Sequence, residues 1–208
     1  MTETPIDPHS PEIVTEGTGH HEQLGDRAEL DVSFTGFAGN RADAVRELGR
    51  RVAAAEPALE LPGLVVRSRQ FWVHNEWQGD RVVGCRAGED IALMLTDTAA
   101  LEEVLSALVG AEPTGLHGPR WALADPAAAQ REAQRRAVED ARQRAEGYAT
   151  ALNGRLGALR RLSDAPSHGG HVALAARESG GPDVRELGLE PEPVRVTARC
   201  LASWTLLT

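Results

Sequence analysis

The chain has 208 residues, a formal net charge of −9 and 41% hydrophobic side chains, enough to build a substantial core. Its acidic balance argues against non-specific binding to nucleic acid and against docking on anionic lipid, because both need a basic surface. All 22 basic residues are arginine, which excludes a lysine-dependent P-loop, kinase or Schiff-base site. We therefore expect no nucleic-acid partner and no insertion into a membrane.

The N-terminal residues 1–11 contain three prolines and few apolar side chains, which predicts a disordered tail. This tail has neither the basic start nor the apolar stretch of a signal peptide, and no run of about 18 apolar residues follows it. We therefore expect a cytoplasmic protein. In that reducing compartment Cys85 and Cys200 should be buried free thiols, although a disulfide stays open if their strands are neighbours.

Strand and helix patterns alternate along the first part of the chain. Asn40 is a good N-cap for a helix, and Gln78-Gly79-Asp80 has the composition of a hairpin turn. The expected elements are strands at 12–17, 28–34, 64–77, 82–96 and 115–124, and helices at 40–55 and 98–109.

A long helix over 126–153 follows, with Asp125 as its N-cap and Pro126 at its first position. Alanine recurs every fourth residue from Ala133 to Ala149, so one face of this helix carries a stripe of small side chains. Such a stripe lets another backbone or a sheet approach closely. Strands at 155–162 and 194–207 complete the chain, separated by a proline- and glycine-interrupted loop at 164–192 that we expect to be mobile.

This order of elements predicts an α+β fold with a largely antiparallel sheet packed by about three helices. We expect the elements to form one compact domain over 12–208, in which the helices near 40–55, 98–109 and 126–153 cover the sheet. Hairpins interleaved with helices argue against a doubly wound parallel sheet.

Histidine pairs are the only candidates for a metal site, and they come without cysteine. His168 and His171 lie three residues apart in the long loop, while His20-His21-Glu22 lies in a glycine-rich stretch; solvated loop histidines are the competing interpretation. His74 and Glu76 share one face of a strand, as an acid–base pair or as a cross-strand polar contact. Gly17-Thr18-Gly19 lacks the third glycine of a dinucleotide site, and no serine elbow occurs. We therefore expect no cofactor and no catalytic residues.

Phe71, Trp72 and Trp77 crowd one predicted strand of a chain with only 4% aromatic residues. Because Phe71 and Trp72 are adjacent, they must point to opposite faces of the sheet. Tryptophan is enriched at interface hot spots, so these residues are candidate contacts of a homo-oligomer. Packing inside one chain is the alternative.

Several short motifs, taken in order along the chain, resemble the SIMPL-domain family over nearly its whole length. They are Ile13-Val14-Thr15-Glu16-Gly17-Thr18-Gly19, Gly25-Asp26-Arg27-Ala28, Gly84-Cys85-Arg86-Ala87, Gly118-Pro119-Arg120-Trp121 and Leu152-Asn153-Gly154-Arg155-Leu156-Gly157. In the second motif the chain lacks the family's proline, and in the third Cys85 replaces an aromatic residue.

The resemblance implies a protein of poorly defined biochemistry, linked with stress tolerance and with assembly into large oligomers, and it supplies no catalytic residues. We therefore expect a non-enzymatic oligomeric assembly or scaffold module. The alternative is a small-molecule binder or hydrolase that uses a cleft under the loop at 164–192, and a deep pocket lined by His168, His171 and carboxylates would favour it.

Overall fold

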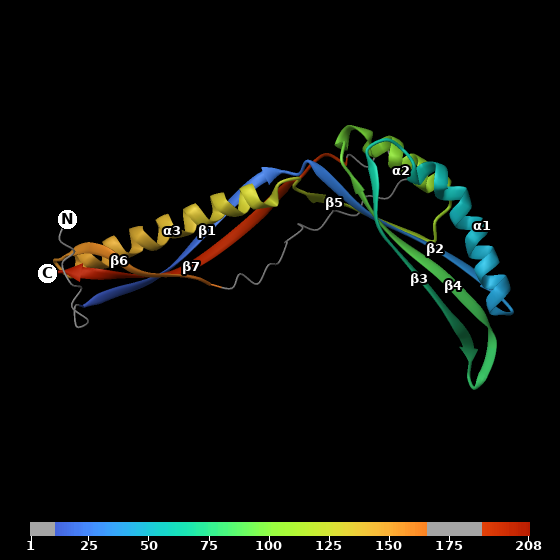
Figure 1. Cartoon of the computed structure of the whole chain (residues 1–208), viewed down its shortest axis with the longest axis horizontal. Coiled ribbons are helices and arrows are strands. Elements are labelled where there is room, and N and C mark those ends of the chain that lie inside the picture. Colours follow the sequence, from blue (N-terminus) through green and yellow to red (C-terminus); the bar gives the residue numbers. More distant parts are fainter. Residues whose placement is uncertain (1–10, 166–188) are drawn as a thin grey trace. The chain divides into compact units, whose positions relative to one another are not determined.

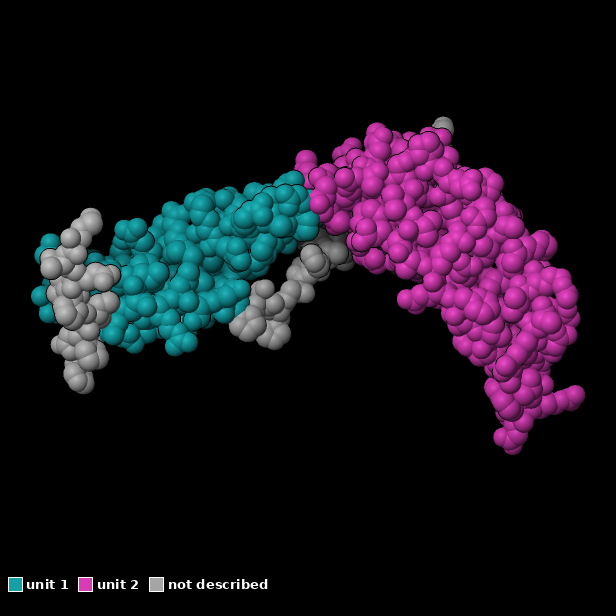
Figure 2. All heavy atoms as spheres, viewed as in Figure 1, with its two compact units in different colours: residues 1–23, 125–172, 194–208 teal, residues 24–124, 173–193 magenta. Residues whose placement is uncertain are grey.

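The computed structural model describes residues 11–165 and 189–208, which divide into two compact units. Unit 2 contains residues 24–124 and 173–193, and unit 1 contains 1–23, 125–172 and 194–208. Unit 2 is therefore inserted into unit 1 between its first strand and its helix. Figure 1 labels the elements, and Figure 2 colours the two units.

The secondary structure follows the order that the sequence predicts. In chain order the elements are β1 (Glu12–Leu24), β2 (Arg27–Ala38), α1 (Arg41–Leu59), β3 (Leu64–Gln78), β4 (Arg81–Leu95), a 3-10 turn (Thr98–Ala100), α2 (Leu101–Gly110), β5 (Gly115–Ala122), α3 (Pro126–Ala151), β6 (Arg155–Asp164) and β7 (Pro193–Leu207).

The predicted α+β class with antiparallel strands is confirmed, but the expectation that all strands form one sheet is wrong. The described strands form two antiparallel sheets, β1-β7-β6 in unit 1 and β3-β4-β2-β5 in unit 2. The alternating pattern of each strand was visible in the sequence. The pattern does not say which strand pairs with which, and here the first and last strands pair with each other.

Unit 2 packs α1 and α2 against one face of its four-stranded sheet (Figure 1). Large aliphatic and aromatic side chains fill this layer, and Phe34 is fully buried in it. Asn40 caps α1, as expected, by accepting a hydrogen bond from the Asp43 backbone N–H. The core residues from β2, β4 and the two helices include Leu30, Val32, Phe34, Leu48, Ile91, Leu93, Leu95, Val104 and Leu108.

Unit 1 packs the long helix α3 against its sheet through very small residues. Its buried stripe is alanine at every fourth position from Ala129 to Ala149. On β1, a Cβ atom added at Gly17 would lie 2.0 Å from the Ala137 carbonyl oxygen, and one added at Gly19 would lie 2.1 Å from that of Ala133. The helix backbone therefore rests directly on the strand, which explains the Gly-x-Gly motif and confirms the close approach that the alanine stripe predicts.

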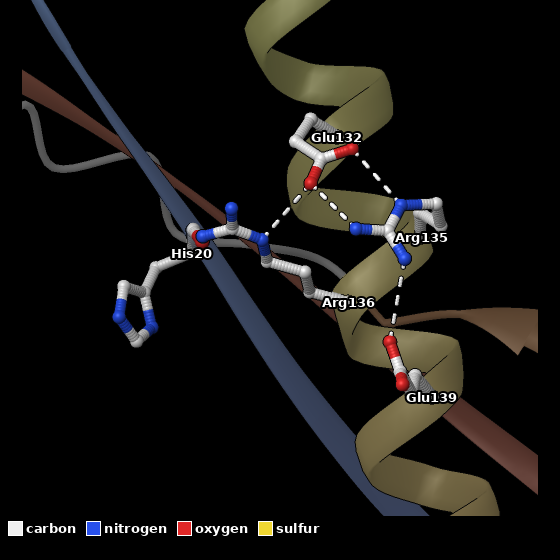
Figure 3. Close-up of polar contacts among 5 residues, drawn as sticks. All are labelled: His20, Glu132, Arg135, Arg136 and Glu139. Carbon is white, nitrogen blue, oxygen red and sulfur yellow. Dashed lines mark hydrogen bonds and ion pairs between the residues drawn. The ribbon is translucent and has the colours of Figure 1, made fainter.

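Charged side chains of α3 reinforce this contact at the edge of the sheet (Figure 3). Glu132 accepts hydrogen bonds from Arg135 and, at 3.0 Å, from Arg136. Arg136 also donates to the backbone carbonyl of His20 on β1, at 2.7 Å. These hydrogen bonds hold the pKa of Glu132 at about 2, because they favour its charged form. The network thus links the helix surface to the strand backbone.

Two expectations fall largely outside the described residues. The tail at 1–11 lies outside them except for Pro11, and the loop at 164–192 lies outside them over 166–188. In the part of the chain that the structure describes, no helix is both long enough and apolar enough to span a bilayer.

Candidate functional site

The β3–β4 hairpin of unit 2 extends past the rest of its sheet. The last pair between β2 and β4 joins Ala38 to Cys85, whereas β3 and β4 continue to pair through Glu76–Gly84 to the turn at Gly79. The end of the hairpin is therefore a two-stranded projection, and Figure 1 shows it reaching beyond the helix that covers the sheet.

Exposed apolar side chains lie on the projection and on the part of β3 that leads to it, where Phe71 pairs with Glu89 of β4. Phe71 and Trp77 are 60% and 61% exposed, and both lie on the helix-bearing face of β3, because they alternate with residues of the other face. Val82 lies opposite Trp77, and Val83 beside it is also exposed. We call Phe71, Trp77, Val82 and Val83 the tip surface. A water-exposed group of this kind is typical of an interaction site.

Trp72 behaves differently from the other two aromatic candidates. It lies on the open face of the sheet, where its Nε1 donates to Asp90 at 2.9 Å and its ring stacks on His74 at 4.2 Å between centroids. Its ring also covers Gly88, since a Cβ added there would lie 2.2 Å from the indole. Trp72 is thus half-buried by its own chain, while neither Phe71 nor Trp72 enters the core.

The outer edge of β3 carries no paired strand in the described residues, because β3 ends the order of its sheet. Its first half is protected by the charges of Arg67 and Arg69 and by a register shift between Val66 and Ser68. From Gln70 to Gln78 the strand has neither proline nor a bulge of its own, and its one carboxylate, Glu76, pairs with Arg86. This half of the edge can therefore accept another strand.

The opposite edge of the same sheet is better protected. Strand β5 has only eight residues, and Pro119 within it has no backbone N–H to offer a neighbouring strand. The two edges of unit 2 thus differ in their capacity for pairing, and β3 is the more open of the two.

A hollow of about 280 Å³ lies on the open face of this sheet, opposite the helices. Two cross-strand rows border it, and each row crosses the four strands β5, β2, β4 and β3. The rows are His117–Asp31–Ala92–Ser68 and Gly115–Ser33–Asp90–Gln70. The small side chains of Ala92 and Gly115 leave room for the hollow, and the other six residues of the two rows are polar.

The two carboxylates of the hollow are held from its margins. Asp90 accepts the Trp72 hydrogen bond through Oδ2, and Asp31 pairs through Oδ2 with Arg120 at 2.9 Å. Sequence reasoning missed this group of residues. The polar alternation at Glu29, Asp31 and Ser33 was visible, but it did not identify the strands that lie beside β2.

The hollow brings a serine, a histidine and an aspartate together without assembling a nucleophile. No hydrogen bond joins Ser33 to His117, or His117 to Asp31, in the described part of the chain. Nucleophilic catalysis needs both contacts, because the base must reach the hydroxyl and be oriented itself.

The other histidines that the sequence singles out do not share one site in the described residues. Glu76 pairs with Arg86 across the strands and His74 stacks on Trp72, which favours the polar-contact interpretation of this pair. His20 and His21 are adjacent on β1 and so point to opposite faces; Figure 3 shows the His20 ring directed away from α3. Across residues 11–165 and 189–208, no three metal-ligating side chains gather to hold an ion. His168 and His171 lie outside the described residues.

The cysteines are free and lie in different cores. Cys85 belongs to the core of unit 2 and Cys200 to that of unit 1. Burial raises the pKa of the Cys200 thiol, so it carries less thiolate than an exposed cysteine would. The expectation of buried free thiols is confirmed.

Comparison with known proteins agrees with the sequence motifs. The model of the family SIMPL, described as a protein of unknown function (DUF541), matches residues 13–204, which is nearly the whole chain. No curated protein matches it. The matched range covers all the strands and helices of both units except the last residues of β7 and the first of β1.

Proposed function

The chain belongs to the SIMPL family, whose function is unknown, and from that premise we propose that it is a non-enzymatic assembly module that joins copies of itself into a homo-oligomer. The observation that carries this proposal is the outer edge of β3 from Gln70 to Gln78, which is open next to exposed aromatic side chains. An open edge presents backbone N–H and C=O groups that a second strand satisfies.

The tip surface supplies the apolar part of the proposed contact. Burying Phe71 and Trp77 against a second copy removes two large side chains from water, and aromatic residues dominate the energy of many interfaces. Of the three aromatic candidates, Phe71 and Trp77 therefore lie in the proposed contact. Trp72 contributes indirectly, because its hydrogen bond to Asp90 and its stacking on His74 order the neighbouring part of β3.

Charged substitutions in the tip surface test the proposal. Trp77→Glu and Phe71→Glu should each weaken self-association about 30-fold or more, because loss of an interface hot spot costs about 2 kcal/mol. The mass in solution, measured by light scattering, should then fall toward the 22.3 kDa of one chain. The far-UV circular dichroism should stay unchanged, because neither side chain belongs to the core.

Val109→Glu is the matched control. Val109 is also an exposed apolar residue of unit 2, but it lies on α2, away from β3. This variant should keep the wild-type mass. The proposal fails if Trp77→Glu keeps the wild-type mass, or if Val109→Glu lowers the mass equally.

The proposal includes a cytoplasmic location and a role in stress tolerance. The location is supported by two buried cysteines that stay unpaired, as in a reducing compartment. The stress role rests on the family resemblance alone. Deleting the gene should lower survival under oxidative challenge, and unchanged survival would remove this part of the proposal. The alternative of a cleft under the loop at 164–192 concerns mainly residues outside the described ones.

A further inference from the structure

We propose that the hollow on the open face of the unit 2 sheet binds a small organic cation with two amine groups, a short diamine. The site lies wholly within unit 2, so it does not depend on the proposed self-association. It is distinct from the tip surface, because the hollow is polar and opens on the opposite face of the sheet.

The size of the hollow sets the first limit on the ligand. About 280 Å³ is near the lower end of the volumes that ligand pockets have, roughly 300–1,000 Å³, so the ligand must be a small metabolite. The floor is formed by Ala92, and polar side chains surround it on all four strands. A ligand that fills this space must therefore carry polar groups that reach these side chains.

Charge sets the second limit. Asp31 and Asp90 line the hollow, and Glu29 lies beside it, while Arg120 is the one cation among residues 11–165 and 189–208 that pairs with Asp31 and Glu29. These four groups leave a local excess of negative charge. Such a field attracts cations and repels phosphates and carboxylates, so nucleotides and organic acids are poor candidates.

The spacing of the two carboxylates favours two amines over one. Ala92 lies directly opposite Asp31, and Asp90 lies two residues from Ala92 on the same strand, so the carboxylates are diagonal neighbours. The Cα atoms of diagonal neighbours in an antiparallel pair are about 7–8 Å apart, and their side chains stand on the same face of the sheet. A short diamine spans this distance and places one ammonium group at each carboxylate.

The two carboxylates are also preorganised for such a ligand. Trp72 binds the Oδ2 atom of Asp90, and Arg120 binds the Oδ2 atom of Asp31. These contacts fix the orientation of both carboxylates. The Oδ1 atom of each has no partner among the described residues. The hydroxyls of Ser33 and Ser68 and the amide of Gln70 lie around the same space and can accept the remaining ammonium protons. Prior orientation lowers the entropy cost of binding.

Calorimetric titration of the full-length protein with putrescine tests the proposal. We expect saturable binding of one putrescine per chain with a Kd below ~1 mM, and no binding of the neutral diol of the same length. Asp90→Asn should weaken binding about tenfold or more, because a charge-assisted hydrogen bond is lost while the amide oxygen can still accept from Trp72. Ala92→Leu should abolish binding by filling the floor without changing any charge.

Asp80→Asn is the matched control, since it removes one carboxylate at the hairpin turn of the same sheet, outside the hollow. It should leave the affinity unchanged. Absence of saturable binding up to ~10 mM putrescine would overturn the proposal. Equal weakening by Asp80→Asn and Asp90→Asn would also overturn it, because the diamine would then be responding to the net charge of the chain. Equal binding of the diol would show that amines are not recognised, and would overturn it too.

Discussion

The two units build the same layer, a helix on an antiparallel sheet, from different kinds of side chain. In unit 2 the layer is filled by large residues such as Phe34, Leu93 and Leu108. In unit 1 it is made of the alanine stripe of α3 and of Gly17 and Gly19, with the helix backbone resting on the strand. In the described residues of unit 2, a helix comes this close to a strand at Gly36, where an added Cβ would lie 2.6 Å from the Ala44 carbonyl oxygen.

The difference determines what each unit tolerates. A layer of large side chains is weakened mainly when atoms are removed, because a cavity remains. A layer in which backbones touch is weakened mainly when atoms are added, because nothing can move aside cheaply. Substitutions of opposite kinds should therefore be the most damaging in the two units.

The largest effect should come from removing atoms in unit 2. Phe34→Ala should lower the free energy of unfolding by about 3–5 kcal/mol, because Phe34 is fully buried between the sheet and its helices. Urea unfolding of the wild type and the variant measures this loss. Phe37→Ala on the same strand is the control; Phe37 is half exposed on the other face, so its loss should stay near 1 kcal/mol. Similar losses for both variants would contradict the assignment of the core.

The next largest loss of stability should come from adding one methyl group in unit 1. Gly19→Ala places a Cβ 2.1 Å from the Ala133 carbonyl oxygen and 2.3 Å from the Ala137 nitrogen, and should cost about 3 kcal/mol. Gly39→Ala is the same substitution where no atom lies within 4 Å, and its effect should stay within about 0.5 kcal/mol. If calorimetry shows equal unfolding temperatures for the two variants, the close approach of α3 to β1 is wrong.

A stabilising change in unit 2 sharpens the same comparison. Gly49 lies in the middle of α1 with no atom within 4 Å of an added Cβ. Gly49→Ala should therefore raise the free energy of unfolding by about 0.5–1 kcal/mol, because alanine loses less backbone entropy in a helix. A destabilised Gly49→Ala variant would mean that this side of α1 is covered.

The smallest effect should be a pH dependence in unit 1. Hydrogen bonds from Arg135 and Arg136 lower the pKa of Glu132 to about 2 from the ordinary 4.5. A depressed pKa contributes stability above the unfolded value and loses it as the pH falls through the folded one. Glu132→Gln should therefore melt below the wild type at pH 7, with a difference that shrinks between about pH 4.5 and about pH 2. A difference that does not change with pH would exclude this origin.

Local structure was predictable because its causes are local. The cap at Asn40, the turn at Gly79 and the alanine period of α3 each act within a few residues, and the predicted elements agree with the observed ones to within a few positions except at the end of β1. The strand predicted at 12–17 extends to Leu24. Its continuation was not predicted, because it contains glycine and two histidines, which are not typical of a strand pattern.

Pairing across the chain was not predictable in the same way. Alternation in β1 and β7 shows that each has a buried face, but it does not show that they share a sheet from which β2 is absent. For the same reason the hollow was missed, because His117 and Asp31 become neighbours only through the register of β5 on β2. The exposure of Trp77 also depends on how far the hairpin runs past the Ala38–Cys85 pair, where β2 ends and α1 begins soon after.

The mass of the wild-type chain in solution, followed by sedimentation equilibrium over a range of micromolar concentrations, tests the central claim most directly. The account predicts a mass that is a multiple of 22.3 kDa, because the open edge of β3 and the tip surface join copies of the chain. This oligomer should dissociate on dilution, so that the measured mass falls. A mass of 22.3 kDa at every concentration would contradict self-assembly.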